Sequence, residues 1–392
     1  MNYDFDRVVE RCGTNCEKYD SLKRIFGTED LVPLWVADMD FETPEFIIDA
    51  LKRRLDHHIL GYSYRPDGFY NAIKGWLKRR WNWDVETSWI QFTPGTVCAV
   101  SLAIRAFSSE GDGVVIQTPV YGPFSWVIEG NRRRVECNPL KYESNGRAVI
   151  DFEDLEEKLS RSKIFILCNP HNPTGRVYTR NELERIAMLC LKYNIIVIAD
   201  EIHCDLIQEP YRHIHFASLG DDAARRSITV SSPAKSFNIA GLSTTAVIIP
   251  DQKLRQEFHR EEESIHIDQG NIFGTIAMEM AYTYGDQWVD SLNDYIKGNI
   301  DYVVGFLADK MPDVKCYPPE AMYLMWLDFR EWGLEHKELC KFMVEKARLG
   351  MSEGRFFGAE GEGFMRINVA APRVIIERAM TQLYEASLLL KR

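Results

Sequence analysis

Four motifs whose side chains or N–H groups could take part in catalysis or binding each follow, or lie close to, a segment that is expected to form a buried strand. Asp200 comes directly after the apolar run 195–199, and Lys235 follows the next such run. Asn172 lies in a Pro/Gly-rich turn, and residues 93–97 open a helix whose free N–H groups would suit an anion. Taken singly, each has an ordinary explanation: a solvated carboxylate, a surface lysine, a tight turn and a plain helix start.

Together, an acid, an amide, a lysine and a helix start are the groups that pyridoxal phosphate requires. The lysine forms a Schiff base with the cofactor, and a carboxylate keeps the pyridine nitrogen protonated so that the ring accepts electrons from a substrate Cα. An amide can bond the ring oxygen, and helix N–H groups stabilise the phosphate. The set therefore predicts a pyridoxal-phosphate enzyme that acts on amino acids.

Five short apolar runs predict strands that are buried on both faces of a sheet. They span residues 113–117, 163–168, 194–199, 227–231 and 245–249. Between two of them, Thr179 and Glu182 form a capping box that opens a helix with one apolar face. Alternating strands and helices indicate an α/β layer with a mostly parallel sheet, whose ligands collect at the carboxyl ends of the strands. One shared site is therefore expected.

A smaller α+β domain is expected after about residue 285, although no composition shift marks the boundary. Helical patterns and strand-like runs alternate there, at residues 288–307, 322–328, 337–349 and 364–369. The predicted division is an N-terminal arm that joins the small domain, a large cofactor-binding domain and the small domain, at residues 1–45, 46–285 and 286–392.

The composition argues against several classes of protein. The chain has 392 residues, 45% of them hydrophobic, and a net charge of −11, which disfavours a nucleic-acid partner. No apolar stretch is long enough for a membrane span, and residues 1–6 are too polar for a secretory signal. Nine dispersed cysteines fit reduced thiols, so we expect a cytoplasmic protein. Cys12 and Cys16 could meet on one helical turn, but no metal site is expected.

Blocks of sequence from about residue 20 to the end resemble class I/II aminotransferases of fold type I. More closely, they resemble the cystathionine β-lyase (C–S lyase) branch of the MalY/PatB type. The blocks that carry this resemblance lie at residues 33–41, 61–62, 118–124, 169–177, 200–203, 235–242 and 363–370. The resemblance implies pyridoxal 5′-phosphate as cofactor, a mostly parallel seven-stranded sheet in a large domain, and a smaller α+β domain.

The resemblance also implies roles at the cofactor ring. Lys235 would form the Schiff base and then move protons at the substrate Cα, while Asp200 would contact the pyridine nitrogen. Tyr121 would stack on the ring, and Asn172 and His203 would bond the ring oxygen. Two alternatives stay open, because His203 could be a satisfied core histidine and Tyr121 a core aromatic residue.

Other matching residues would hold the phosphate and the substrate. The expected phosphate ligands are Gly95, Thr96, Val97 and Ser232. Tyr62 would reach the phosphate of a neighbouring subunit, with Tyr64 as its competitor, which implies a homodimer with shared active sites. Arg366 would clamp the substrate α-carboxylate as a planar bidentate donor, near Ala37 and Asn172.

One position departs from the pattern of many fold-type-I aminotransferases, which carry an arginine eight residues after the lysine. Ser243 occupies that position here. The C–S lyase branch also lacks this arginine, so the phosphate would depend more on helix N–H groups and hydroxyls.

Three functions are consistent with these residues. The leading hypothesis is β-elimination from a sulfur amino acid such as cystathionine or cysteine, which gives pyruvate, ammonia and a thiol. An aminotransferase would use the same groups for the first proton transfer but would return the proton to the cofactor. The third hypothesis is a regulatory protein that keeps the fold without catalysis. The presence of every residue that the chemistry requires argues against this hypothesis.

Overall fold

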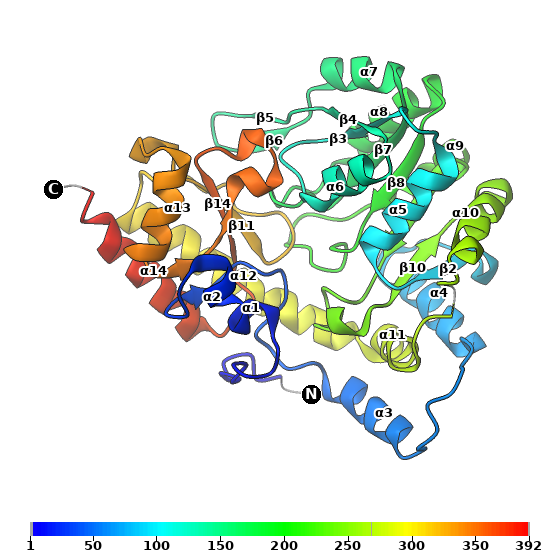
Figure 1. The fold of residues 1–392 in the computed structure, drawn as a ribbon, viewed down its shortest axis with the longest axis horizontal. Coiled ribbons are helices and arrows are strands. Elements are labelled where there is room, and N and C mark those ends of the chain that lie inside the picture. The colour runs from blue at the N-terminus through cyan, green and yellow to red at the C-terminus, as the bar shows by residue number, and fades with distance from the viewer. Residues whose placement is uncertain (1–2, 268, 391–392) are drawn as a thin grey trace.

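A seven-stranded sheet organises the computed structural model, which describes residues 3–267 and 269–390 (Figure 1). In sheet order the strands are β2 (Ile90–Thr93), β10 (Thr245–Ile248), β9 (Ser227–Ser231), β8 (Ile196–Asp200), β7 (Ser162–Cys168), β3 (Gly113–Ile116) and β4 (Arg134–Cys137). β10 runs antiparallel to both of its neighbours, and the other neighbouring pairs are parallel. The expectation of a mostly parallel seven-stranded sheet is confirmed.

Helices cover both faces of this sheet because its strands alternate apolar side chains between two cores. Ile164 and Ile166 of β7 belong to the core that α5 (Thr96–Phe107), α6 (Pro123–Gly130) and α10 (Gln252–Ser264) complete. Phe165 and Leu167 belong to the opposite core, with α7 (Phe152–Ser160) and α8 (Arg180–Lys192). All four side chains are at most 1% exposed, so the strand is buried on both faces, as predicted.

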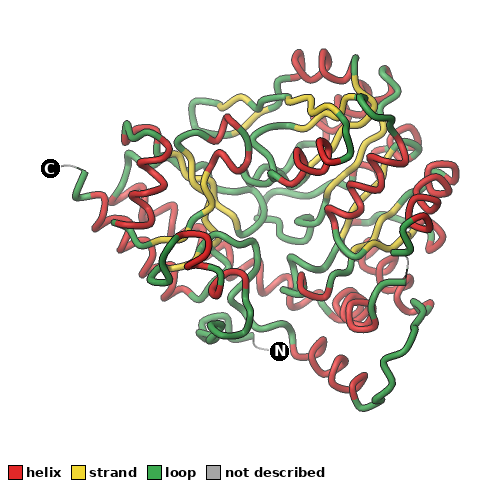
Figure 2. Tube along the Cα trace, viewed as in Figure 1, coloured by secondary structure: helices red, strands yellow, loops and turns green. Residues whose placement is uncertain are grey.

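The remaining elements of the N-terminal 285 residues are short or lie around this layer (Figures 1 and 2). The α-helices and strands among them are α1 (Glu17–Asp20), α2 (Leu22–Phe26), β1 (Val32–Pro33), α3 (Glu45–Leu55), α4 (Asp67–Trp81), β5 (Lys141–Tyr142), β6 (Ala148–Val149), α9 (Asp221–Ala224) and α11 (Ile272–Tyr284). The predicted capping box of α8 is present, since Thr179 and Glu182 bond each other's backbone N–H groups. No helix within the described residues has the length and apolar character that crossing a membrane requires.

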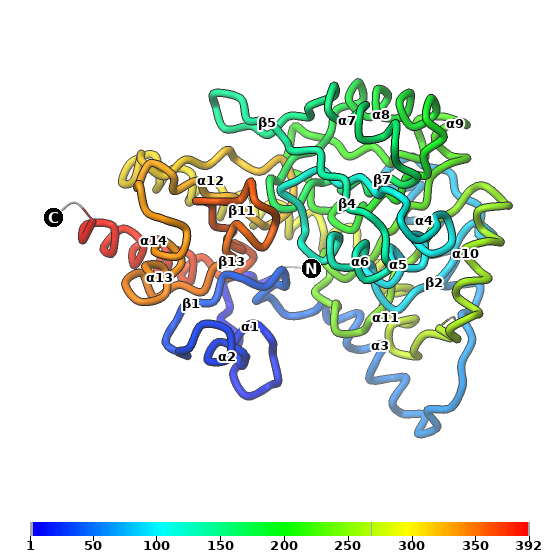
Figure 3. The backbone as a smooth tube through the Cα atoms, turned by 45° about the horizontal axis from the view of Figure 1, so that its top comes forward, coloured from blue at the N-terminus to red at the C-terminus, as the bar shows by residue number. Residues whose placement is uncertain are grey.

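The C-terminal part is built on the long helix α12 (Asp286–Lys310) and an antiparallel three-stranded sheet. This sheet contains β11 (Leu324–Asp328), β14 (Phe364–Asn368) and β13 (Ser352–Glu353), and the helices beside it are α13 (His336–Glu345) and α14 (Arg373–Ser387). Figure 3 shows α1 and α2 beside this part, near β1 and α13. The N-terminal arm thus lies next to the C-terminal residues.

The predicted C-terminal end of one helix is wrong. The pattern at residues 337–349 predicted a helix throughout, but α13 ends at Glu345. Arg348 has a positive φ of 56°, and Leu349 pairs with Val32 in a parallel β1–β12 ladder, where β12 spans Leu349–Gly350. The strand from the N-terminal arm therefore takes hydrogen bonds that a continued helix would have needed, and a local pattern carries no sign of this partner.

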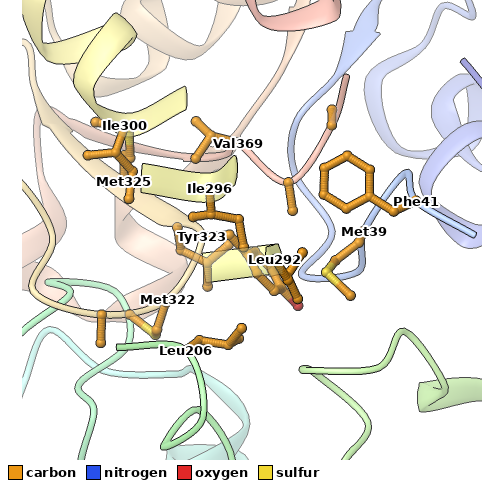
Figure 4. Packing of buried hydrophobic residues seen from close by; sticks show 14 of the residues in the cluster. Met39, Phe41, Leu206, Leu292, Ile296, Ile300, Met322, Tyr323, Met325 and Val369 are labelled. Atoms are coloured by element: carbon orange, nitrogen blue, oxygen red, sulfur yellow. The ribbon is translucent and has the colours of Figure 1, made fainter. Parts of the chain in front are cut away.

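A shared core joins the arm to the C-terminal part (Figure 4). Met39 and Phe41 of the arm belong to the same cluster as Leu292 and Ile296 of α12 and the neighbouring Tyr323. These side chains are at most 5% exposed, and burying each large apolar side chain contributes about 1.5–3 kcal/mol. The arm is thereby held close to the chain that forms the site, whereas the division at residues 45 and 285 stays a prediction.

Candidate active site

A cavity of about 1100 Å³ lies where the carboxyl ends of β7, β8 and β9 face β13 and β14. Every site residue predicted from the sequence lines it except Tyr62. The lining includes Ala37, Gly95, Thr96, Val97, Tyr121, Asn172, Asp200, His203, Ser232, Lys235 and Arg366. Residues that are far apart in the chain therefore meet in one cavity.

Lys235 reaches this cavity from the loop that follows β9. Its Nζ donates a 2.9 Å hydrogen bond to the carbonyl oxygen of Ala37, which also accepts a 3.1 Å bond from the hydroxyl of Tyr323. Burial, together with the nearby cation of Arg366, lowers the pKa of Lys235 to about 8. An amine with such a pKa is partly neutral near physiological pH and can therefore act as a nucleophile or a base.

Asp200 ends β8, where pairing to β7 on one side and β9 on the other fixes its backbone. Its side chain is buried, and its Oδ1 accepts a 3.3 Å bond from the N–H of Ile202. Burial raises the pKa of Asp200 to about 7, although that N–H and the cation of Lys235 oppose the rise. A buried carboxylate with so few partners fits a protonated ring nitrogen, whose positive charge would stabilise the ionised acid.

Arg366 lies on β14 with its guanidinium buried in the cavity wall. It donates 3.0 Å to Asn172 Oδ1, 2.8 Å to the carbonyl of Trp35 and 3.1 Å to Ser352 Oγ, while its Nε has no partner among the described residues. Burial lowers the pKa of Arg366 to about 10, so it stays charged at neutral pH. Its hydrogen bonds go to neutral acceptors, so this buried cation fits an incoming carboxylate.

His203 and Tyr121 complete the wall near Asp200. The Nδ1 of His203 is buried without a hydrogen-bond partner in the described residues, which argues against a satisfied core histidine. Burial, with the nearby cations Lys235 and Arg366, lowers the pKa of His203 far below its usual range, so the ring is neutral. Burial also raises the pKa of Tyr121, which is therefore a neutral phenol.

The start of α5 provides N–H groups for an anion. The first intrahelical bond runs from the N–H of Ala99 to the carbonyl of Gly95, which leaves the N–H groups before Ala99 for a ligand. Ser232 stands beside them, where its Oγ donates a 2.7 Å bond to the carbonyl of Thr244. Ser243, at the position where many fold-type-I aminotransferases carry an arginine, also lines the cavity. These groups fit a phosphate.

Tyr62 and Tyr64 lie outside the cavity on the segment between α3 and α4, 98% and 83% exposed. Within this chain neither reaches the site, so their predicted role rests on a second copy. The sequence also missed Tyr323 and Ser352, which hold Ala37 and Arg366. Tyr323 lies inside a strand-like run, where an aromatic residue is usually interpreted as part of the hydrophobic core. No sequence motif marks Ser352.

Taken together, the fold and the cavity define an α/β protein with the lysine, acid, amide and anion site that a pyridoxal-phosphate enzyme needs. The sequence profile described as aminotransferase class I and II matches residues 29–383. The chain therefore belongs to the class I and II aminotransferase family. The resemblance that the sequence blocks predicted is confirmed.

The relatives similar to this chain include proteins named as a cystathionine β-lyase and a C–S lyase. The chain is 43% identical to cystathionine β-lyase PatB of Bacillus subtilis over 98% of this chain and 99% of PatB. It is 35% identical to protein MalY of Escherichia coli, covering 98% of each. Among solved structures, cystalysin from Treponema denticola, which contains pyridoxal 5′-phosphate, has a TM-score of 0.96 at 36% identity and full coverage of both chains. The C–S lyase from Staphylococcus hominis has a TM-score of 0.92 at 31% identity, covering 98% of each.

Proposed function

We propose that this chain is a pyridoxal-phosphate-dependent C–S lyase that carries out β-elimination on sulfur amino acids such as cystathionine or cysteine. The products are pyruvate, ammonia and a thiol. The observation that carries the proposal is the meeting of Lys235, Asp200 and Arg366 in one cavity. The 43% identity to a cystathionine β-lyase over nearly the whole chain supports elimination over other reactions of the family.

The cavity residues would hold the cofactor by three kinds of contact. Asp200 would pair with the pyridine nitrogen, Asn172 and His203 would bond the ring oxygen, and Tyr121 would stack on the ring. The phosphate would be bound by Gly95, Thr96, Val97 and Ser232. When bound, pyridoxal phosphate supplies an aldehyde that bonds to amines and a ring that accepts the electrons released at Cα.

This chain's own side chains would then bind the substrate and move its proton. Arg366 would hold the α-carboxylate with two parallel N–H groups, which fixes the orientation of Cα. Lys235, partly neutral because of its lowered pKa, would take the Cα proton as general base. The Cβ–S bond breaks as the thiol leaves with the bonding electron pair, and the remaining carbon skeleton hydrolyses to pyruvate and ammonia.

We also propose a homodimer in which Tyr62 contributes to the partner's phosphate site. Support comes from the segment around it, where Ile59, Leu60, Tyr62 and Tyr64 are all more than half exposed. Several large apolar side chains in one exposed segment indicate a surface that another protein covers. A cytoplasmic location is part of the same proposal, because all nine cysteines are free.

Incubation of the purified protein with L-cystathionine tests the reaction. Elimination predicts pyruvate and a thiol without any added keto acid, and the Lys235→Ala variant should release neither. Strict dependence of product on a keto acid acceptor would instead show an aminotransferase, because that reaction must return the amino group to a second substrate.

A further inference from the structure

The chain segment that follows Asp200 carries a second group of buried polar side chains, which the proposed mechanism does not use. The N–H of Glu201 bonds to β9 at 3.0 Å, so the chain stays extended and the side chain of Glu201 points away from that of Asp200. Glu201 lies there with Cys204, His213 and His215, which we call the Cys/His cluster. Its four side chains belong to residues at most 5% exposed, and none of them lines the catalytic cavity.

Three of the four ring nitrogens of this cluster make no hydrogen bond, although the Nε2 of His213 lies 3.5 Å from the Oε2 of Glu201. Both nitrogens of His213 and the Nε2 of His215 are buried without a hydrogen bond among residues 3–267 and 269–390. Cys204, His213 and His215 can each offer one ligand atom, and these atoms lie within 4.8 Å of one another. Buried polar atoms are normally paired, so several buried ring nitrogens without hydrogen bonds, on residues grouped with a buried thiol, point to a ligand.

Glu201 orients one of these rings. Its Oε2 is in contact with the Nδ1 of His215, and its Oε1 accepts a 2.9 Å bond from the N–H of Phe216. When the carboxylate accepts a hydrogen bond from Nδ1–H of the neutral ring, the lone pair of Nε2 is free. Histidines that bind metals are commonly held by a carboxylate in this way.

We propose that Cys204, His213 and His215 bind a divalent transition-metal ion, with Zn²⁺ as the first candidate and Glu201 as the carboxylate that orients His215. Thiolate and imidazole donors select zinc and related late transition metals rather than Mg²⁺ or Ca²⁺. On binding, the Cys204 thiol releases its proton to solvent, and the negative charges of the thiolate and Glu201 balance the ion.

The surroundings give this site a structural role. The ring of Trp83 lies 4.6 Å from that of His215, and the ring of Trp81 lies 5.6 Å from that of His213, between ring centroids. Such an enclosed ion would not reach a substrate. It would instead fix the segment 201–216, which carries His203 at the wall of the catalytic cavity.

A second group of similar composition provides an internal comparison. His336, Cys340 and Glu353 also place their ligand atoms within 4.8 Å of one another. However, His336 accepts a 3.2 Å bond from the N–H of Gly363 and lies 3.0 Å from Glu353, so both of its nitrogens have partners. This second group therefore needs no ion.

Metal analysis of the holoenzyme, purified without chelators from zinc-supplemented cells, tests the proposal. We expect about one zinc per chain, lost in Cys204→Ser and in His215→Ala. Two variants should keep it: Cys190→Ala, which removes another fully buried thiol, and Cys340→Ser in the second group. A wild-type protein without bound metal overturns the proposal, as does full metal content in Cys204→Ser.

A spectroscopic measurement keeps the test decisive if the buried variants do not fold. Wild-type protein produced with cobalt in place of zinc should show the visible d–d bands of Co²⁺ in a cysteine- and histidine-bound site, and the Cys340→Ser variant should show them equally. Absence of these bands from folded wild-type protein overturns the site. Neither readout depends on catalysis, so failure here is distinguishable from failure of the proposed lyase activity.

Discussion

Arg366 donates a 3.0 Å hydrogen bond from Nη1 to Oδ1 of Asn172, although the two residues are 194 positions apart in the chain. The bond joins β14 to the turn that follows β7, so it links the C-terminal sheet to the carboxyl end of an interior strand of the seven-stranded sheet. It also orients the amide of Asn172. Because Oδ1 faces the guanidinium, the NH₂ group of Asn172 is left to donate, as a ring oxygen would require.

Arg366→Ala should lower kcat/KM for L-cystathionine by roughly 10²–10⁴-fold, since two charge-assisted hydrogen bonds contribute about 1.5–3 kcal/mol each. Most of the change should be a rise in KM. Arg366→Lys keeps the charge but loses the planar fork, so it should be intermediate. Steady-state kinetics measure both variants. An unchanged KM in Arg366→Ala would contradict the assignment of this side chain to the substrate carboxylate.

Lys235→Ala should abolish turnover, with a fall in kcat of at least ~10²-fold, because it removes the base that moves the Cα proton. It should also remove the visible absorbance that the wild-type protein acquires from covalently bound pyridoxal phosphate. Lys253→Ala, which changes an exposed lysine of α10, is a suitable control and should leave both readouts intact. Retention of the absorbance band in Lys235→Ala would contradict the role of Lys235.

The buried acid predicts how stability depends on pH in the cofactor-free protein. The pKa of Asp200 is raised from 3.8 to about 7, so the folded chain binds the proton more tightly than the unfolded chain. The stabilisation from this group is present below about pH 4 and is lost as the pH rises towards 7, by at most about 4 kcal/mol. Thermal unfolding at pH 5 and pH 8 should show a larger loss for wild type than for Asp200→Asn.

Bound cofactor should reduce this dependence, because a protonated ring nitrogen stabilises the ionised carboxylate. If wild type and Asp200→Asn lose the same stability between the two pH values, Asp200 does not carry the raised pKa.

Tyr62→Phe should weaken pyridoxal-phosphate affinity by about 10- to 100-fold, because one hydrogen bond to a charged group contributes about 1.5–3 kcal/mol. Tyr64→Phe removes the same hydroxyl two residues further on and is the matched control. Fluorescence titration of the cofactor into each apoprotein gives the two Kd values. A weaker Kd in Tyr64→Phe alone would assign the contact to Tyr64, and two unchanged values would exclude both tyrosines.

Much of the fold could be predicted because its signals are local. The run at 227–231 coincides with β9, and the capping box at Thr179 opens α8, since strand periodicity and helix capping depend on neighbours in sequence. The end of α13 was predicted wrongly, because β1, more than 300 residues earlier, pairs with the chain there.

The features of the site likewise divide into those that the sequence predicted and those that only the tertiary structure showed. The sequence alone placed Asp200 and Lys235 at strand ends, because the carboxyl ends of parallel strands must share one edge of the sheet. Only the tertiary structure showed the Ala37 carbonyl on Lys235, the Arg366 bond to Asn172 and the Cys/His cluster behind Asp200. These features depend on distances between segments that fold together, and no spacing along the chain records such distances. Burial, which shifts the pKa of Lys235 and Asp200, likewise exists only once the chain has packed.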